Sequence, residues 1–388
     1  MLLVVGGGVA AANSAVAARK FGYPGPITVL SREKLPPYDR TPLSKQVLLD
    51  GDLTPPTLPV DWTGLDITLR LDETATALHD GVVHTERGRF PYHHLVIATG
   101  ATPIRLPGAG TPYLLRTHAD ACRLRGLMAR AGELVIVGAG WIGAEAATAA
   151  RALGCRVTVL DSGAAPQVEL AGAEVSAVFA RWYAEHGIEL RLGRQVAAVE
   201  PDAVITTTGE VFPATAVLVG VGARPAVDWL AGSAVRVDGG VLVDPHLRTN
   251  LDGVYAAGDV ASYQSRRYAR LLRCEHFADA QNSAVVVGQN LNGKDGVYDP
   301  VPYGWSEQFG HRVQFLGHHD PGDEPLWRGA PTDPRWSACW LRADRLRAIL
   351  AVNAPQDILH ARKIMQNDLP LDPTRLADPG IPLKRAVA

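Results

Sequence analysis

Two stretches of the chain share the same order of apolar, glycine and alanine positions. The first, LLVVGGGVAAANSAVAARKFG, spans residues 2–22, and the second, ELVIVGAGWIGAEAATAARALG, spans residues 133–154. Each is a short apolar run, a glycine-rich turn and an alanine-rich segment that closes at a glycine, the usual signal for the end of a helix. Each is followed by another buried-type strand, at 27–30 and 156–160. The pattern predicts two βαβ units and therefore two parallel sheets.

Further strand patterns occur at 93–103, 215–225 and 248–261. From Val301 the pattern changes. The segments RVQFLG and WSACWLRADRLRAILAV predict antiparallel strands, and PQDILHARKIM predicts a helix with Ile358, Ala361 and Met365 on one face. The proline-rich tail after Asn367 is expected to run extended over the surface. The fold class is therefore α/β, with two Rossmann-like dinucleotide-binding domains and a C-terminal α+β domain.

One segment, PPYDRTPLSK at 36–45, has neither the helical nor the strand period. It carries three prolines, two cations and a tyrosine of exposed type. The segment predicts a stiff, charged loop directly after a strand. The prolines fix backbone angles and reduce the entropy lost when such a loop is ordered.

Composition narrows the class of protein. The 388 residues suggest two or three domains, and a 47% hydrophobic fraction with a net charge of −2 is typical of a soluble globular protein. This balance does not favour nucleic acid or a membrane as partner. The N-terminus has no basic region before its apolar run, and three glycines interrupt that run, so it predicts a buried strand and not a signal peptide.

The four cysteines are far apart, which predicts neither disulfides nor a metal site and favours a reducing cytoplasm. They are Cys122, Cys155, Cys274 and Cys339.

Gly138, Gly140 and Gly143 form an intact GxGxxG motif. The first glycine permits a tight turn, the second lets a pyrophosphate approach the helix N-terminus, and the third lets helix and strand pack closely. Asp161 ends the next strand, where a carboxylate can accept hydrogen bonds from ribose hydroxyls and repel a 2′-phosphate. Neither Ser162 nor Gly163 offers a cation, so NADH is favoured over NADPH.

Gly6, Gly8 and Ala11 form the variant GxGxxA, and Glu33 is the candidate for the adenosine ribose. Either loop alone could be a plain tight turn between strand and helix. Two copies, each in a βαβ context and each followed by an acid, favour two dinucleotides. A nicotinamide carries a hydride that a flavin accepts, and Gly258 and Asp259 in VYAAGDVA offer close backbone approach and a carboxylate for the ribityl chain of FAD.

Taken together, several motifs resemble the ferredoxin reductase branch of the two-dinucleotide-fold flavoproteins, the type that serves bacterial cytochrome P450s and ring-hydroxylating dioxygenases. They are GGGVAA, YDRTPLSK, ATGATP, GAGWIGAE, GARP, YAAGDVA, CEHFADAQN and WSEQ. The resemblance implies a glutathione-reductase-like architecture with a discontinuous FAD-binding domain at 1–106 and 239–300. It also implies an NADH-binding domain at 107–238 and a C-terminal reductase domain at 301–388.

The resemblance also implies roles for individual residues. Lys45 and Glu145 are implied to form an ion pair near flavin N5. Other residues implied to contact FAD are Arg40, Pro42, Thr99, Gly100, Asp259, Glu275, His276, Phe277 and Trp305, and those implied to contact NADH include Ile142 and Gly222. From the residues alone, Lys45 could equally be a solvated lysine, and Glu145 an acid favoured by the helix dipole.

Phe277 departs from the pattern, because close relatives usually carry tryptophan there. Phenylalanine keeps an apolar face but lacks the indole N–H. This difference motivates a second hypothesis, a flavoenzyme acting directly on a small organic substrate. A third is a non-catalytic, nicotinamide-sensing protein.

The electron acceptor is inferred from the cysteines and the arginines. No cysteine lies in YDRTPLSK, and Cys155 has no second cysteine near it in the chain, so a dithiol relay is not expected. The leading hypothesis is transfer of single electrons to a two-iron two-sulfur ferredoxin. Ferredoxins are acidic, and docking calls for a basic patch. The candidates are one cluster of Arg266, Arg267, Arg270 and Arg273, and a second of Arg335, Arg342, Arg345 and Arg347.

Overall fold

The computed structural model describes residues 1–130, 132–214, 216–320 and 322–388. The chain divides into two compact units. The first unit contains residues 1–41, 54–102 and 223–300, and the second contains residues 42–53, 103–222 and 301–388. The loop PPYDRTPLSK is therefore split, with Arg40 in the first unit and Lys45 in the second.

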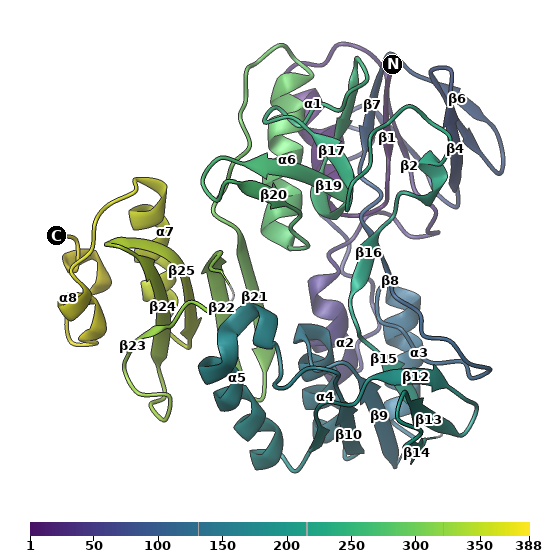
Figure 1. Cartoon of the computed structure of the whole chain (residues 1–388). Coiled ribbons are helices and arrows are strands. Elements are labelled where there is room, and N and C mark those ends of the chain that lie inside the picture. The colour runs from purple at the N-terminus through teal and green to yellow at the C-terminus, as the bar shows by residue number, and fades with distance from the viewer. Residues whose placement is uncertain (131, 215, 321) are drawn as a thin grey trace. The chain divides into compact units, whose positions relative to one another are not determined.

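A five-stranded parallel sheet forms the centre of the first unit, in the order β18-β7-β1-β2-β3. Its strands are β1 (Leu2–Val5), β2 (Ile27–Leu30), β3 (Ile67–Arg70), β7 (His94–Ile97) and β18 (Val254–Ala256). The predicted first βαβ unit is confirmed: α1 (Val9–Lys20) joins β1 to β2, which pair in parallel register. Helix α6 (Phe277–Asn290) packs along α1, as Figure 1 shows.

Smaller sheets complete the first unit. One is antiparallel, with β4 (Ala75–His79), β5 (Val82–Thr85) and β6 (Arg89–Pro91). Another has β17 (Val241–Val243), β19 (Ala261–Ser265) and β20 (Arg270–Leu272), of which β19 and β20 form a hairpin. Strands β8 (Ala101–Pro103) and β16 (Ala223–Pro225) pair with each other, and two 3-10 turns are η2 (Asp228–Leu230) and η3 (Gly258–Val260).

The second unit contains the other predicted βαβ unit. Its parallel sheet has the order β11-β10-β9-β15, with β9 (Glu133–Val137), β10 (Arg156–Leu160), β11 (Glu189–Arg191) and β15 (Val217–Val219). The helices of this part are α2 (Gln46–Leu49), α3 (His118–Met128), α4 (Trp141–Ala152) and α5 (Val168–Glu185), and the 3-10 turn η1 (Thr41–Ser44) precedes α2. A small antiparallel sheet has β12 (Val196–Val199), β13 (Ala203–Thr206) and β14 (Val211–Pro213).

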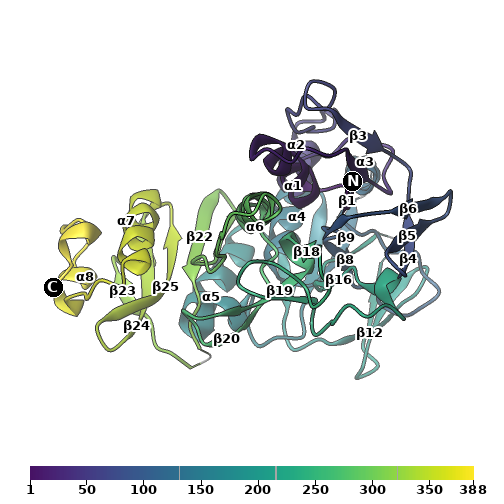
Figure 2. The ribbon, with the colours of Figure 1, turned by 90° about the horizontal axis from the view of Figure 1, so that it is seen from above.

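The C-terminal part of the second unit is a five-stranded antiparallel sheet in the order β21-β22-β25-β24-β23. Its strands are β21 (Tyr303–Gln308), β22 (His311–Gly317), β23 (Leu326–Arg328), β24 (Trp336–Arg342) and β25 (Arg345–Val352). Helix α7 (Pro355–Gln366) packs on β25 (Figure 2). Its buried face includes Ile358, Ala361 and Met365, as the helical period predicts.

The expectation for the tail after Asn367 is wrong. The tail forms helix α8 (Pro373–Ala377) and the 3-10 turn η4 (Leu383–Arg385), and its apolar residues join the core of the C-terminal sheet. Leu371, Leu376 and Leu383 are at most 1% exposed.

Arg328 holds this tail in place. Its side chain is buried, with Nε donating to the carboxylate of Asp357 at 3.0 Å and Nη1 donating to the carbonyl of Leu376 at 3.0 Å. Nη2 donates to the carbonyl of Ile381 at 2.7 Å. One guanidinium thus satisfies backbone carbonyls that the tail would otherwise bury without partners.

Replacing Arg328 with methionine should lower the free energy of unfolding by about 3–5 kcal/mol, because Asp357 is left as a buried charge without its cation. Urea denaturation followed by the fluorescence of the buried Trp336 and Trp340 measures the change. The control is Arg375→Met, which alters an exposed arginine of the same tail. It should change the free energy by less than about 0.5 kcal/mol. Equal effects of the two variants would contradict the role given to Arg328.

Candidate functional site

The first glycine loop joins β1 to α1. Gly6 has a φ of 148°, and a Cβ there would collide with the carbonyl oxygen of Ala98. Ala11, the third position of the motif, is fully buried. Gly8 is the N-cap of α1, and the nearest atom that a Cβ there would meet outside its own turn is Nε of Arg40, at 4.0 Å. The loop is closely packed at its first and third positions and open at the second.

The second loop, between β9 and α4, has the same division. A Cβ on Gly138, whose φ is 107°, would collide with the carbonyl oxygen of Gly220, and one on Gly143 would collide with that of Gly138. A Cβ on Gly140, the N-cap of α4, would meet nothing within 4 Å among the described residues outside its own turn. No side chain in the described ranges caps α1 or α4. Each helix N-terminus therefore presents backbone N–H groups at an open position, as a pyrophosphate requires.

Asp161 is tied to the second loop. Its Oδ2 accepts the N–H of Ala139 at 2.6 Å, and its Oδ1 accepts the N–H of Gly163 at 2.7 Å. The carboxylate thus fixes the glycine loop to the end of β10. Each carboxylate oxygen can accept a further hydrogen bond, so this anchoring leaves room for a ribose hydroxyl.

Glu33 has protein partners too. Its Oε2 accepts the hydroxyl of Tyr38 at 2.6 Å, and its Oε1 accepts Nη2 of Arg40 at 2.6 Å. The guanidinium of Arg40 also lies over the Tyr38 ring, 4.9 Å from its centroid. Tyr38 is 0% exposed, so the expectation of an exposed tyrosine is wrong. The loop folds back because this ring packs inward while its hydroxyl reaches a carboxylate.

The segment VYAAGDVA runs from β18 into η3. Gly258 has a φ of 72°, and a Cβ there would lie 2.7 Å from Cβ of Ala10 on α1, so only glycine lets the two segments approach. Its N–H donates to the hydroxyl of Ser283 on α6 at 3.0 Å. Asp259 follows directly, half-buried in η3.

Helix α6 begins at the implied flavin segment. His276 is its N-cap and Phe277 its first residue, packed against the core of the first unit. Burial lowers the pKa of His276. Glu275 forms an ion pair with Arg273, whose Nη1 also donates to the carbonyl of Asp259 at 3.1 Å. The first arginine cluster is thus partly neutralised at Arg273.

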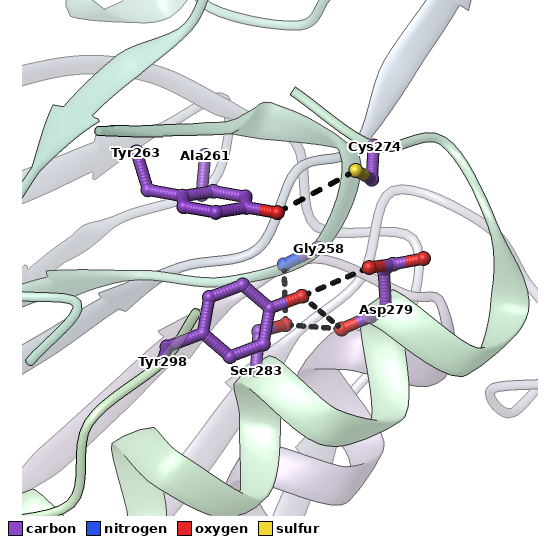
Figure 3. A pocket seen from close by; sticks show the side chains of 7 residues that line it. All are labelled: Gly258, Ala261, Tyr263, Cys274, Asp279, Ser283 and Tyr298. Carbon is purple, nitrogen blue, oxygen red and sulfur yellow. Dashed lines mark hydrogen bonds between the residues drawn. The ribbon is translucent and has the colours of Figure 1, made fainter. Parts of the chain in front are cut away.

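A buried polar cluster lies beneath Gly258, and sequence reasoning missed it. Figure 3 shows Tyr263, Cys274, Asp279 and Tyr298 around one small cavity. The Tyr298 hydroxyl donates to Oδ1 of Asp279 at 3.1 Å, and the Tyr263 hydroxyl lies 3.7 Å from the Cys274 sulfur. Burial raises the pKa of the Cys274 thiol to about 12, and nearby Asp279 adds to the shift. The four groups lie up to 35 positions apart in the chain, so no local pattern marks them.

The remaining candidates have separate places. The Thr99 hydroxyl donates to the carbonyl of Ala226 at 2.8 Å, and Gly100 has a φ of 69°. Both lie at the end of β7. In the second unit, Ile142 is exposed in the first turn of α4, and Gly222 has a φ of 107° after β15. Exposure of an isoleucine in a helix otherwise well buried leaves an apolar surface beside the second glycine loop.

Lys45 and Glu145 form a buried ion pair in the second unit. Lys45 Nζ lies 2.9 Å from Glu145 Oε2, and the side chains are 9% and 3% exposed. Glu145 also accepts the hydroxyls of Ser44 and Ser306, the latter at 2.6 Å from Oε1. The N–H of Lys45 donates to the carbonyl of Pro42 at 3.1 Å, which closes the turn before α2. The ion pair was expected from the resemblance, whereas neither serine was identified.

Trp305 covers the ammonium group. Lys45 Nζ lies 4.7 Å from the centroid of the Trp305 ring, and the Arg312 guanidinium lies 5.6 Å from the same ring. A cation held over an indole is attracted by the negative face of the ring. Lys45 is therefore held between a carboxylate and an aromatic face.

No disulfide joins the four cysteines, all of which lie in the described ranges: Cys122, Cys155, Cys274 and Cys339. Cys155 donates to the carbonyl of Met128 at 3.2 Å, and burial raises the pKa of both Cys155 and Cys339. Throughout 1–130, 132–214, 216–320 and 322–388 no group of three or more His, Cys, Asp or Glu side chains is arranged to hold a metal ion. Within those same ranges, no helix has the length and apolar character needed to span a bilayer.

Several known proteins with similar sequences are named as reductases. The chain is 34% identical to rhodocoxin reductase of Rhodococcus erythropolis over 406 residues, covering 100% of this chain and 94% of that protein. It is 35% identical to the chlorobenzene dioxygenase ferredoxin reductase component of Cupriavidus sp. (strain PS12), covering 97% and 94%. The crystal structure of Fdr9 matches with a TM-score of 0.94 and 43% identity over 98% of each chain. The covalent putidaredoxin reductase–putidaredoxin complex matches with a TM-score of 0.94 and 29% identity, over 99% and 97%.

Two parallel sheets that each present an open glycine loop define a dinucleotide-binding oxidoreductase. The chain belongs to the pyridine nucleotide-disulphide oxidoreductase family, whose model matches residues 1–284. Residues 303–387 match the reductase C-terminal model, and this segment contains the antiparallel sheet with Trp305 and Ser306.

Two of the three glycines of the second loop, Gly140 and Gly143, should respond differently to alanine. Gly140→Ala places a methyl group where the protein leaves open space, so the midpoint of thermal unfolding should hardly change while NADH binds more weakly. Gly143→Ala drives the methyl group into the Gly138 carbonyl and should destabilise the protein by about 1–3 kcal/mol. Thermal unfolding and NADH titration check both. A loss of stability in Gly140→Ala with NADH affinity intact would contradict the phosphate-loop interpretation.

The buried Cys274 thiol predicts a pH dependence of stability. Its pKa is about 12 in the folded protein and has an ordinary value of 9.0 when exposed. As the pH rises above 9, the unfolded chain releases this proton first, so the free energy of unfolding should fall between pH 9 and about 12. Urea midpoints measured across this range should fall less steeply in Cys274→Ala. If the urea midpoint of Cys274→Ala falls with pH as steeply as that of the wild type, the pH dependence does not come from Cys274.

Proposed function

We propose that the protein is an NADH-dependent FAD flavoprotein that passes electrons singly to a two-iron two-sulfur ferredoxin serving a P450 or Rieske oxygenase. The observation that carries the proposal is the presence of two open glycine loops, each with an anchored acid. The relatives support it, because several are named as ferredoxin reductase components of dioxygenases. Another is named putidaredoxin reductase.

In this proposal the first unit holds FAD. Gly6, Gly8 and Ala11 receive the pyrophosphate at the α1 N-terminus, and Asp259 binds the ribityl chain. Glu33 binds the adenosine ribose, and Arg40 supplies positive charge beside Gly8, which is supported by its Nε lying 4.0 Å from where a Cβ on Gly8 would be. FAD, when bound, accepts a hydride and returns the two electrons one at a time. The other proposed contacts are Pro42, Lys45, Thr99, Gly100, Gly258, Glu275, His276, Phe277 and Trp305.

The second glycine loop is proposed to hold NADH. Gly138, Gly140 and Gly143 receive its pyrophosphate, and the free lone pairs of Asp161 receive the ribose hydroxyls. A 2′-phosphate would be placed against that carboxylate, and the following Ser162 and Gly163 supply no cation, which favours NADH over NADPH. Ile142 and Gly222 are proposed to line the same site.

Lys45 and Glu145 are proposed as the catalytic pair at the flavin. An ammonium group stabilises the negative charge that a reduced flavin carries, and a carboxylate partner fixes the position of the ammonium. Burial of the pair supports this role. Burying two charges costs desolvation free energy, so such a pair adds little to stability and is better explained by a function.

We propose FAD-binding boundaries of 1–106 and 239–300, NADH-binding boundaries of 107–238 and a C-terminal domain at 301–388. The compact units differ from this division chiefly at 42–53, which belong to the second unit, and at 223–238, which belong to the first. A reducing, cytoplasmic location is also proposed, which is supported by four cysteines that form no disulfide.

The β19–β20 hairpin is the proposed docking surface for the acidic ferredoxin. Arg266 and Arg270 are exposed on it. The Asp299 carboxylate fixes the hairpin loop by accepting the Ser265 hydroxyl at 2.6 Å and the Arg266 N–H at 3.1 Å. Both clusters contain paired arginines: Arg273 pairs with Glu275 in the first, and Arg342 with Asp320 in the second. The hairpin is proposed because its exposed arginines share one short loop, where they can face an acidic partner together.

The test uses purified protein loaded with FAD. NADH is added without oxygen, followed by an acidic two-iron two-sulfur ferredoxin and cytochrome c. The expected result is rapid bleaching of the flavin and cytochrome reduction that depends on the ferredoxin. Bleaching without cytochrome reduction for every such ferredoxin tried would overturn the proposal.

The same assay tests the hairpin. Arg266→Glu combined with Arg270→Glu should raise the KM for ferredoxin about tenfold or more, with a weaker dependence on salt. Reduction of ferricyanide by NADH should stay unchanged, because it does not need docking. Arg335→Glu, an exposed arginine of the other cluster, is the matched control and should leave the KM within about twofold.

A further inference from the structure

The carboxylate of Glu145 receives three side-chain donors. Oε2 accepts Nζ of Lys45 and the hydroxyl of Ser44, and Oε1 accepts the hydroxyl of Ser306 at 2.6 Å. Ser44 is 3% exposed and Ser306 is 0% exposed, so water does not compete freely for either bond. The Glu145 side chain is only 3% exposed, and a carboxylate so deeply buried needs such donors to compensate for its lost hydration.

The two serines bond different oxygens of the Glu145 carboxylate. With Ser306 bonded to Oε1, the carboxylate cannot rotate about its terminal bond without losing that donor, so Oε2 stays directed at Lys45. Ser44 precedes Lys45 in the chain and bonds the same oxygen, so the backbone of Lys45 is also tied to its partner. Bonds between hydroxyl donors and a carboxylate are among the stronger and more directional hydrogen bonds in proteins.

Strand β21 acts on both members of the ion pair. Trp305 places its ring 4.7 Å from the ammonium, and the next residue, Ser306, bonds the carboxylate. We propose that Ser306, supported by Ser44, is a positioning residue for the Lys45–Glu145 pair. The inference rests on the proposed function of that pair at the flavin.

A purely structural role for Ser306 would be to hold β21 on the neighbouring helices, but other bonds at the end of this strand already do this. The N–H of Phe309 donates to the hydroxyl of Thr148 on α4 at 2.9 Å. Gln308, the last residue of β21, accepts Nε2 of Gln167, the N-cap of α5, at 3.1 Å. Thr148→Val is therefore a matched control, because it removes one hydroxyl bond between α4 and the residue that follows β21 without touching Glu145.

The experiment compares Ser306→Ala, Ser306→Thr, Ser44→Ala and Thr148→Val in protein loaded with FAD. The limiting rate of flavin reduction and the Kd of NADH are measured by anaerobic stopped flow, and the flavin midpoint potential by titration against a reference dye. Ser306→Ala should lower the limiting rate about tenfold, since a small misplacement of a catalytic group has an effect of this order or larger. The Kd of NADH should stay within about twofold, because Ser306 does not contact the proposed NADH site.

The midpoint potential of the flavin should shift in Ser306→Ala in the same direction as in Glu145→Gln, because both variants weaken the contacts that position Lys45. Ser306→Thr, which keeps the hydroxyl, should restore most of the rate, and Thr148→Val should match the wild type in rate and potential. Ser44→Ala should repeat the loss seen in Ser306→Ala and gives an independent test if that variant does not fold. The inference is overturned if Ser306→Ala and Ser44→Ala behave like Thr148→Val, or if threonine does not rescue.

Glu145→Gln and Lys45→Met separate this inference from the proposed function. If both variants reduce the flavin at the wild-type rate, the catalytic role of the pair is wrong, and the role of the serines is wrong with it. If both are slow while Ser306→Ala and Ser44→Ala are normal, the pair acts at the flavin and only the positioning role is wrong.

Discussion

Within the second unit, the buried carboxylate of Glu145 requires hydrogen-bond donors, and these come from distant segments of the chain. Glu145 lies on α4, and its donors come from residues 44, 45 and 306, which are up to 262 positions apart in the chain. An anion so deeply buried is costly unless every lone pair that faces the protein is used. The three segments must therefore meet at one point, and the chain places a serine at two of the contacts. The hydrogen bonds that stabilise the Glu145 carboxylate are therefore also the contacts that position Lys45.

The glycine loops obey a different constraint, which is steric. At the first and third positions of each motif, packing leaves no space for a Cβ except that of Ala11, whereas the second position stays open. This division follows from the path of a chain that turns from a strand directly into a helix: the outer positions must pack on the sheet, and the middle position faces away from it. The acids Glu33 and Asp161 then differ in a way the motif does not predict. Asp161 is anchored by backbone donors of its own loop, and Glu33 by the side chains of Tyr38 and Arg40.

The elements that sequence reasoning predicted are those with local signals. The two βαβ units, the antiparallel C-terminal strands and the buried face of α7 follow from periodicity and from glycines at fixed offsets. The features it missed depend on distant partners. Tyr38 was expected to be exposed because its neighbours are proline and charged residues, yet its ring is buried and its hydroxyl binds Glu33. Ser306 lies in the WSEQ motif, but nothing local marks its role, because a serine in a strand is ordinary until a carboxylate is known to face it.

The split of PPYDRTPLSK between the two units gives its composition a physical reason. Arg40 is held by Glu33 in the first unit, and five residues later Lys45 is held by Glu145 in the second. Each cation is fixed by a carboxylate from its own unit, so the short stretch between them joins two independently anchored charges. Between them, Pro42 and the 3-10 turn η1 limit the backbone angles of the connection. The carboxylates therefore fix the two cations, and the proline reduces the entropy lost when the turn between them is ordered.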